Sequence, residues 1–389
     1  MNLRSFLKLR NHESGSFGSS SPEIAPDHFR FGLGSALYVL LAFLVGAEAQ
    51  AEVPETNPPI PERVDRIALG SCAHHKRSQP IWEAVLAAKP DLFVFLGDNV
   101  YADTEDPEEM RAAYADLAAK PGFAELRGRV PVLATWDDHD YGVNDGGAEF
   151  PKKAMAEEIF HEFFRTPEDA PSRRRPGIYS AHTFGVEKGE RLQLILLDTR
   201  YFRGELVELP ERGRDGPYDV NLDPSATILG EEQWIWLEER LREPADIRII
   251  GSSIQVLPQD HHWERWENFP RERRRLLDLL QSCDTGPVLF VSGDRHMGEL
   301  MRLDEEDPAS PGFPVYELTT SGLTNAGGGR RGEPNRHRVS PINFQSRNFG
   351  MLVIDWERRK VAMELRDVEG EIVDSHTADL SRESSSREP

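Results

Sequence analysis

Carboxylates, histidines and a thiol directly follow short apolar stretches in this sequence. The clearest case is residues 91–101, where five large apolar residues end at Gly97-Asp98 and Tyr101 follows. So short a run favours a strand buried on both faces over a helix. Ligands of open α/β sheets bind beyond the carboxyl ends of strands. Asp98 is therefore predicted to lie at the sheet edge where ligands bind. Gly97, which has no Cβ, permits close approach of the backbone and a ligand there.

The same pattern occurs four more times along the chain. Apolar strands are predicted at 66–70, 130–135, 192–197 and 287–291, and they lead into Cys72, into Asp138 and His139, into Arg200, and into Asp294 and His296, respectively. Five strands that each end in metal-binding or phosphate-binding residue types predict an active site.

Three carboxylates surround one imidazole in the segment Asp137-Asp138-His139-Asp140. Such a concentration of like charge is costly unless a cation neutralises it. A solvent-exposed charge run is the alternative interpretation, but the apolar strand and Trp136 before it argue against simple exposure. Asp294 and His296, two positions apart, have the spacing of neighbouring ligands on a loop.

Tyr101 and Cys72 are candidate ligands of a strong Lewis acid. A free phenol has a pKa of about 10, so a phenolate at neutral pH requires such an ion, and a thiolate suits the same ion. The alternatives are that Tyr101 only packs and that Cys72 is a small buried apolar residue. Cys283 is predicted to be such a small buried apolar residue. His74 and His75 are either ligands or loop residues. Together these groups indicate at least two metals that activate water and hold a tetrahedral anion.

Composition and charge narrow the class of protein. The 389 residues carry a formal net charge of −21, which argues against general binding to a nucleic-acid backbone. Small phosphorylated substrates remain possible, because metal ions supply local positive charge. With two cysteines, a disulfide framework is not expected.

The N-terminal region has the pattern of an export signal. An apolar segment, 31–45, is shorter than the roughly 20 residues of a spanning helix and precedes small residues at 46–51. We expect a leader and signal peptide at 1–51, with export to the periplasm or outside the cell and only transient membrane contact. An uncleaved membrane anchor is the alternative. A linker at 52–63, one domain at 64–380 and a solvated tail at 381–389 complete the predicted organisation.

Strands and helices alternate from residue 64 onward, and the chain ends in strands. Helices are predicted from Ser78-Gln-Pro80, with Ser78 as a possible N-cap, and at 107–119, 154–164, 231–241 and 271–280; further strands are predicted at 315–320, 351–356, 361–366 and 371–375. This order suggests an α/β (α+β) fold in which two sheets pack together with helices outside.

Five motifs, in this order, resemble the PhoD-like alkaline phosphatases of the metallophosphoesterase superfamily. They are Gly-Ser-Cys72, Leu-Gly-Asp98-Asn-Val-Tyr101, Trp-Asp-Asp138-His139-Asp, Leu-Asp198-Thr-Arg200 and Gly-Asp294-Arg-His296. The resemblance spans roughly 64–379. It implies a four-layer αββα sandwich of two packed mixed sheets flanked by helices, with the site at one edge. It also implies hydrolysis of small phosphate esters through attack of a metal-bound hydroxide.

The resemblance also implies roles for single residues. Fe(III) would be held by Cys72, Asp98, Tyr101 and His296, and one or two Ca²⁺, or other divalent metals, by Asp98, Asp138 and Asp294. His139 would serve the leaving group, and Asn144 and Arg200 would contact phosphate. Cys72 replaces the superfamily's first Asp-x-His, and Asp138-His139 replaces its Gly-Asn-His, as in the PhoD-like branch. Phosphodiesterase or phospholipase activity, and a non-catalytic protein that binds phosphate or a partner, are the alternatives.

One segment remains unassigned by these motifs. Residues 326–347 contain five arginines, Arg330, Arg331, Arg336, Arg338 and Arg347, in an otherwise acidic chain. The segment is either a surface loop whose charge balances acidic neighbours or a flap that attracts an anionic substrate, since guanidinium groups pair with phosphate oxygens.

Overall fold

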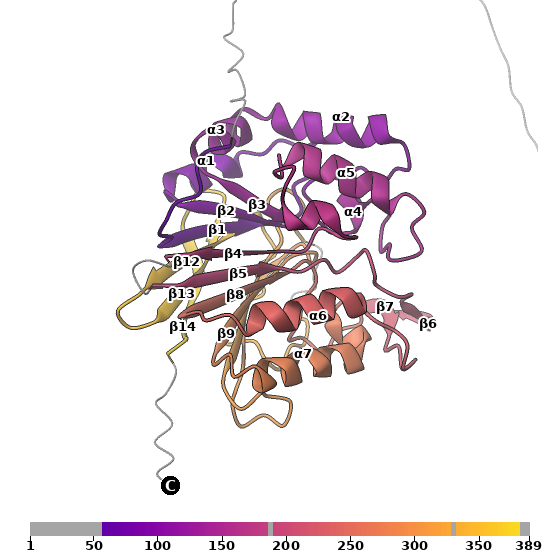
Figure 1. The fold of residues 1–389 in the computed structure, drawn as a ribbon, viewed down its shortest axis with the longest axis vertical. Coiled ribbons are helices and arrows are strands. Elements are labelled where there is room, and N and C mark those ends of the chain that lie inside the picture. The colour runs from indigo at the N-terminus through magenta and orange to yellow at the C-terminus, as the bar shows by residue number, and fades with distance from the viewer. Residues whose placement is uncertain (1–56, 186–189, 328–331, 382–389) are drawn as a thin grey trace, which may run out of the picture. The chain divides into compact units, whose positions relative to one another are not determined.

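A computed structural model describes residues 57–185, 190–327 and 332–381 (Figure 1). The predicted leader and signal, the first part of the linker and nearly all of the tail lie outside these residues. No helix within the described ranges is long and apolar enough to cross a bilayer. The described residues belong to one compact unit, Ala51–Pro389.

The first of two six-stranded mixed sheets carries the strands that lead into Cys72, Asp98 and Asp138. Its strand order is β14-β13-β12-β1-β2-β3, in which β1, β2 and β3 run parallel and the others antiparallel. The strands are β1 (Arg66–Gly70), β2 (Leu92–Leu96), β3 (Val132–Thr135), β12 (Asn348–Asp355), β13 (Lys360–Asp367) and β14 (Ile372–Asp379).

The second sheet carries the strand that leads into Asp294. Its order is β10-β11-β9-β8-β5-β4, with the four central strands parallel and both edge strands antiparallel. The strands are β4 (Ser180–Phe184), β5 (Leu192–Leu196), β8 (Ile247–Ser252), β9 (Val288–Ser292), β10 (Gly298–Leu303) and β11 (Val315–Thr320). A separate hairpin joins β6 (Val207–Gly213) to β7 (Gly216–Asp219).

The helices lie outside the two sheets (Figure 1). They are α1 (Ile81–Ala87), α2 (Pro107–Ala118), α3 (Pro121–Arg129), α4 (Asp138–Tyr141), α5 (Lys153–Phe163), α6 (Gly230–Leu241) and α7 (Pro270–Ser282), with short 3₁₀ turns at Pro171–Arg174 and Trp266–Asn268. Helices α1, α2, α3 and α5 cover the first sheet, and α6 and α7 cover the second.

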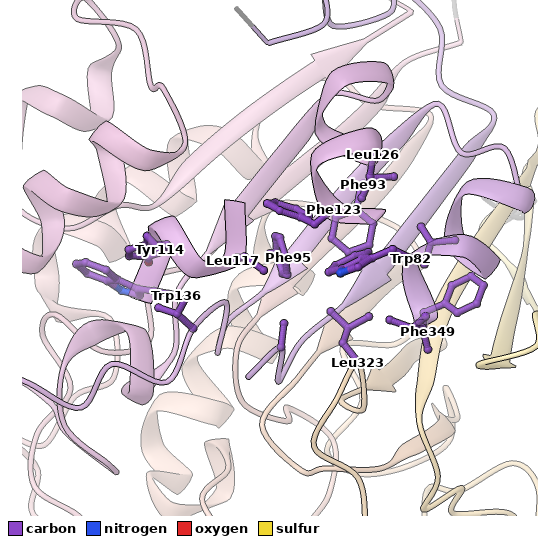
Figure 2. Close-up of a cluster of buried hydrophobic side chains, with 14 of the residues drawn as sticks. Trp82, Phe93, Phe95, Tyr114, Leu117, Phe123, Leu126, Trp136, Leu323 and Phe349 are labelled. Carbon is purple, nitrogen blue, oxygen red and sulfur yellow. The ribbon is translucent and has the colours of Figure 1, made fainter. Parts of the chain in front are cut away.

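Three buried clusters hold these layers together. The middle cluster joins the facing sides of the sheets, for example Leu69 and Val94 with Leu289 and Val291. Because strand side chains alternate between faces, Phe93 and Phe95 point outward from the first sheet, into the helices (Figure 2). The order helix, sheet, sheet, helix confirms the predicted four-layer sandwich.

Several local predictions differ from the structure. Ser78 is not an N-cap, because α1 begins at Ile81 and Pro80 precedes it. Helix α3, which begins at Pro121, was not predicted. Strand β3 begins at Val132, two residues later than the predicted start at 130. Strands β4, β6, β7, β8 and β10 were not predicted, although β8 is mostly apolar.

The aromatic cluster beneath α1 and α3 gives a prediction about stability. Phe95 is fully buried, and its ring lies 5.9 Å from Trp82 and 5.7 Å from Phe123 between centroids. Phe95→Ala should lower the free energy of unfolding by about 3–5 kcal/mol, because a cavity replaces these contacts. Urea denaturation should show a lower midpoint at an unchanged slope. Ile235→Ala, on an exposed position of α6, should cost about 0.5 kcal/mol or less, and equal losses in both variants would contradict this packing.

Candidate active site

Four predicted site residues adopt a backbone conformation that is unfavourable for residues other than glycine. Cys72, Asp98, Asp294 and His296 have φ angles of 60°, 51°, 65° and 53°. The left-handed conformation costs about 1–2 kcal/mol per residue, and such strain gathers at functional sites. Each of the four follows the carboxyl end of a parallel strand, where the chain must turn sharply to present its side chain.

Cys72, Asp98, Tyr101 and His296 form one tight group. The thiol of Cys72 lies 3.2 Å from Oδ2 of Asp98. The Tyr101 hydroxyl donates to the same oxygen at 3.1 Å and lies 2.9 Å from Nε2 of His296. Ligand atoms of Cys72, Asp98 and His296 all lie within 4.8 Å of one another. The predicted first ligand set therefore converges in space.

Asp98, Asp138 and His139 form a second group whose ligand atoms also lie within 4.8 Å of one another. Asp98 is common to both groups and is only 1% exposed. Its Oδ1 is buried without a hydrogen-bond partner. A buried, unpaired carboxylate oxygen is costly, and a cation shared by the two groups would satisfy it.

The acids of the site have unusual proton affinities. Burial raises the pKa of the Cys72 thiol to about 11. Burial, followed by the charges of Cys72 and Asp138, raises the pKa of Asp98 well above its usual value. Burial likewise raises the pKa of Tyr101, and Asp98 adds to the effect. The site thus collects anionic ligands that only nearby positive charge would keep deprotonated.

His139 is held by an aspartate that the sequence did not reveal. Its Nδ1 lies 2.7 Å from Oδ1 of Asp103, and its ring packs tilted against that of Tyr101 at 4.1 Å between centroids. Burial alone would lower its pKa, but the hydrogen bond to Asp103 and the charges of Asp138 and Asp98 raise the pKa to about 10. Because Asp103 occupies Nδ1, Nε2 is the nitrogen left to serve the site.

Asp138 begins the short helix α4 and is fixed by main-chain donors. Its Oδ2 accepts from the amide of Asp145 at 2.7 Å, and its Oδ1 accepts from the amide of His139 at 2.9 Å. Burial raises its pKa, but Arg200 and His139 outweigh burial, and the net pKa is about 2. This side chain is therefore an anion at neutral pH.

Asp294 belongs to the same region but not to either tight group. Its carbonyl oxygen lies 3.8 Å from the Cys72 sulfur. Burial raises the pKa of its carboxyl group, and the charge of Asp137 adds to this effect. Ser321 was not predicted as a site residue. Its hydroxyl forms a hydrogen bond with the Cys72 thiol at 3.0 Å and accepts from the His296 amide at 2.8 Å, so it connects the loops that carry these two residues.

Arg200 is fully buried beside the site. It has no exposed surface, and it donates to Asp137 at 2.5 Å and to Glu264 at 3.0 Å. Its contact with phosphate stays a prediction, since both of these contacts are with the protein's own carboxylates. The guanidinium neutralises two buried carboxylates, and Asp137 stands directly before Asp138. These contacts fix the end of the strand that leads into Asp137.

Asn144 lies on the exposed turn after α4. Its side-chain amide donates to Oδ2 of Asp145 at 2.7 Å, and Asp145 in turn contacts Asp138 through its main chain. Asn144 is thus near the second group and accessible from solvent, which keeps it available for the predicted contact with phosphate.

Two further residues fix the loop after β2. Asp140 accepts from the main-chain amides of Asp98 and Asn99 at 3.2 and 3.3 Å. Gly97 has a φ of 95°, and a Cβ there would lie 2.5 Å from the Cβ of Asp137. The glycine thus permits the approach of the next strand end, whereas the sequence suggested the approach of a ligand.

The remaining candidates support the site without joining its tight groups. The ring of His74 stacks on Tyr101 at 4.9 Å between centroids, and Nδ1 of His75 accepts from the Tyr101 amide at 3.3 Å. Cys283 packs partly buried against the core beneath α7, which agrees with its predicted role.

The basic segment 326–347 is only partly described, since Arg330 and Arg331 lie outside the described residues. Arg336 pairs with Asp260, and Arg338 pairs with Glu299. These two guanidiniums are engaged by the protein's own carboxylates. The surface-loop interpretation therefore fits Arg336 and Arg338 better than the flap interpretation does.

The sandwich and its strand-end site define a fold shared with metal-dependent phosphatases. The chain is similar to the solved structure of PhoD, with a TM-score of 0.64 and 19% identity over 83% of this chain and 70% of that one. It is also similar to a dimetal phosphatase from Danio rerio, with a TM-score of 0.51 and 15% identity over 82% and 99% of the two chains. For the purple acid phosphatase PPD1 of yellow lupin (Lupinus luteus) seeds, the TM-score is 0.53 and the identity 12%, over 82% and 55%.

Sequence comparison identifies the family within this class. The family model for the PhoD-like phosphatases matches residues 67–365, and the chain belongs to this family. Alkaline phosphatase D of Bacillus subtilis (strain 168) is 22% identical over an alignment of 352 residues, and the match covers 78% of this chain and 56% of the relative. The chain thus spans just over half the length of this curated relative. The predicted family is confirmed.

Proposed function

We propose that this protein is a metal-dependent hydrolase of small phosphate esters, of the alkaline phosphatase D type. The observation that carries the proposal is the pair of ligand groups that share Asp98, whose Oδ1 is buried and unpaired. A carboxylate between two sets of ligands suits a dinuclear centre, as in phosphatases that clamp a tetrahedral anion between two ions. Family membership supports the same activity.

The residues present fit the proposed metals. Cys72, Asp98, Tyr101 and His296 would hold an Fe(III), because thiolate, phenolate and imidazole ligands suit a strong Lewis acid. Asp98 and Asp138 would hold one or two Ca²⁺ or other divalent ions, because carboxylate oxygens suit hard cations. Asp294 joins this second set if its side chain turns toward Asp138. When bound, these ions would activate water and neutralise the phosphoryl oxygens.

The chain's own residues would donate the proton to the leaving group and orient the phosphate. His139, with Nδ1 bonded to Asp103, keeps Nε2–H available to protonate the departing alkoxide. Asp98 and Asp138 raise the pKa of His139, and cations bound to them would offset this contribution. The hydrogen bond from His139 to Asp103, which also raises the pKa, would remain. Arg200 would hold Asp137 and thereby the start of α4, and Asn144 would offer an amide to the phosphate.

The identity of the first metal gives a prediction about colour. Tyr101 phenolate bound to Fe(III) should give the purified protein a broad visible charge-transfer band. Tyr101→Phe should bleach or shift this band, since the phenolate ligand is lost. Absorption spectroscopy with iron analysis measures both effects, and Tyr218→Phe, a tyrosine bonded to Asp145, is the matched control. A colourless, iron-free and fully active protein would remove Fe(III) from the proposal.

The activity itself is tested by hydrolysis of chromogenic esters. Purified protein should release 4-nitrophenol from 4-nitrophenyl phosphate, lose this activity on chelation and regain it with added metal. Parallel assays with bis(4-nitrophenyl) phosphate and a phospholipid distinguish monoesterase, diesterase and phospholipase activity. Binding of orthophosphate without turnover of any ester by metal-loaded protein would instead indicate the non-catalytic alternative.

Export is a separate proposal, motivated by the apolar segment 31–45 and the small residues at 46–51. Expression of the full chain in a bacterial host should yield a mature protein that begins near residue 52 in the exported fraction. N-terminal sequencing tests this expectation. Full-length protein retained in the membrane fraction would favour the anchor instead.

A further inference from the structure

A cavity of about 890 Å³ opens on the side of the sandwich where both sheets end. Its walls include Val132 and Ala134 of β3 and Ala181 of β4, the edge strands of the two sheets. Phe160 and Trp236, from α5 and α6, close it from the helix layers. None of the predicted metal ligands lines it. Its volume and mainly apolar walls are typical of a small-molecule site.

The ionisable residues that line this cavity are all basic, beside neutral polar residues such as Thr166 and Ser172. Its lining includes Arg165, Arg175 and Arg240 together with His161 and His182. No aspartate or glutamate occurs among the described lining residues, although the whole chain has a net charge of −21. The cavity therefore combines an apolar interior with positive charge that attracts an anion, although the charge of Arg240 is already paired with Glu243 at 2.6 Å.

Arg175 is the strongest sign of a missing partner. Its guanidinium carbon lies 3.9 Å from the ring centroid of Tyr179 and 5.3 Å from that of Trp236. One amino group donates to the carbonyl of Tyr179, but Nε is buried and has no hydrogen-bond partner. It makes no ion pair with any carboxylate in the described part of the chain, although the charge of Glu157 acts on it from beyond ion-pair distance. A guanidinium placed on aromatic rings without an anion is costly to keep partly buried.

His161 provides a second, independent sign. The side chain is 3% exposed, and its Nδ1 lies 3.0 Å from Oγ1 of Thr166. Its Nε2 is buried and makes no hydrogen bond of good geometry, although the main chain of Ser172 lies close to the ring. When the Thr166 hydroxyl donates to Nδ1, Nε2 carries a proton that is free to be donated to a ligand.

We propose that this cavity binds a single-chain anionic amphiphile, with the alkyl chain between β3 and β4 and the anionic head group beside Arg175 and His161. A neutral hydrocarbon would leave the buried donors unpaired, whereas a small inorganic anion would leave the apolar walls unfilled. A fatty acid and an alkyl phosphate share the required chemistry. This site is separate from the metal site and does not depend on the proposed phosphatase activity.

The test is calorimetric titration of metal-loaded full-length protein with dodecanoate below its critical micelle concentration. We expect one saturable site per chain, with an affinity that rises about fourfold per methylene from octanoate to dodecanoate. Dodecylphosphonate in place of dodecanoate shows which head group is preferred. Dodecyltrimethylammonium should bind at least about tenfold more weakly, because its charge is reversed.

Two variants locate the ligand. Arg175→Gln should weaken dodecanoate binding about tenfold or more, because it removes a charged hydrogen-bond donor, and Arg129→Gln, at an exposed arginine of α3, should leave it unchanged. Ala181→Trp should abolish binding by filling the cavity, whereas Ala112→Trp, on the exposed face of α2, should not. Thermal denaturation verifies folding, and the Ala181 pair suffices if Arg175→Gln does not fold.

Binding should also persist in Asp98→Asn, which separates this site from the metal site. Absence of saturable dodecanoate binding, equal affinity for the cationic amphiphile, or unchanged affinity in folded Arg175→Gln and Ala181→Trp would each overturn the proposal.

Discussion

Asp98→Asn should lower the turnover of phosphate esters by about three orders of magnitude and also lower the metal content. Asp98 contributes to both ligand groups, so its loss affects two ions at once. The substitution keeps the side-chain shape but removes the negative charge and replaces one acceptor oxygen with a donor. Metal ions supply several kcal/mol of transition-state stabilisation, and each factor of ten in rate corresponds to about 1.4 kcal/mol.

Steady-state kinetics and elemental analysis on the same sample measure both effects. Asp116→Asn, an exposed aspartate on α2, is the matched control and should retain wild-type turnover and metal content. If Asp98→Asn kept near-normal activity and stoichiometry while folded, the site would have to lie elsewhere. A loss of metal without a loss of turnover would separate metal binding from catalysis.

His139→Gln should reduce turnover by about 10²–10⁴-fold, the usual contribution of a general acid, with little change in metal content. The reduction should depend on the leaving group. It should be large for an alkyl phosphate, whose alkoxide needs a proton, and small for 4-nitrophenyl phosphate, whose phenolate is a weak base. A merely structural role for His139 would reduce both rates equally.

Asp103→Asn tests how His139 is held. Asp103 contacts His139 and belongs to neither ligand group, so the variant should lose about 10–100-fold in turnover on the alkyl ester. The double variant with His139→Gln should be little worse than His139→Gln alone, because both changes remove one function. Additive losses would show that Asp103 acts independently of the histidine.

The strands that end at the site were predictable because two local signals coincide there. Buried strands such as β2 consist of continuous apolar residues, and they end at glycine or at a cluster of polar residues. Such strands could be located from the sequence within one or two residues, and their parallel order places Cys72, Asp98 and Asp138 at one edge. The resemblance in motifs then supplied the four-layer arrangement, which local patterns suggest only in outline.

The partners of these residues were not predictable, because they come from distant parts of the chain. Arg200 follows a strand end like the other candidates, yet it meets Asp137 and Glu264 and is entirely buried. Ser321 is 249 residues from Cys72 in sequence. Asp103 is nearer to His139, but it has a φ of 45° and its amide donates to the carbonyl of His139, details of the main chain that the sequence does not reveal. Contacts of this kind depend on tertiary packing, which local patterns do not encode.

The same reasoning applies to the cavity between β3 and β4. Ala181 and Val132 look like ordinary strand residues, and His161 looks like a polar residue on an amphipathic helix. Only the meeting of two sheet edges exposes their apolar side chains to a common space. Arg175, in a run of three arginines, gives no sign in the sequence that its side chain lies on aromatic rings.

Anomalous diffraction from crystals of the active, purified protein tests the shared-ligand site most directly. Data recorded on both sides of the iron absorption edge should give one iron peak bonded to Cys72, Asp98, Tyr101 and His296. Additional density, without an iron signal, should lie against Asp98 and Asp138. Fully active crystals with no metal density at Asp98, or with their metals bound by other residues, would contradict the site described above.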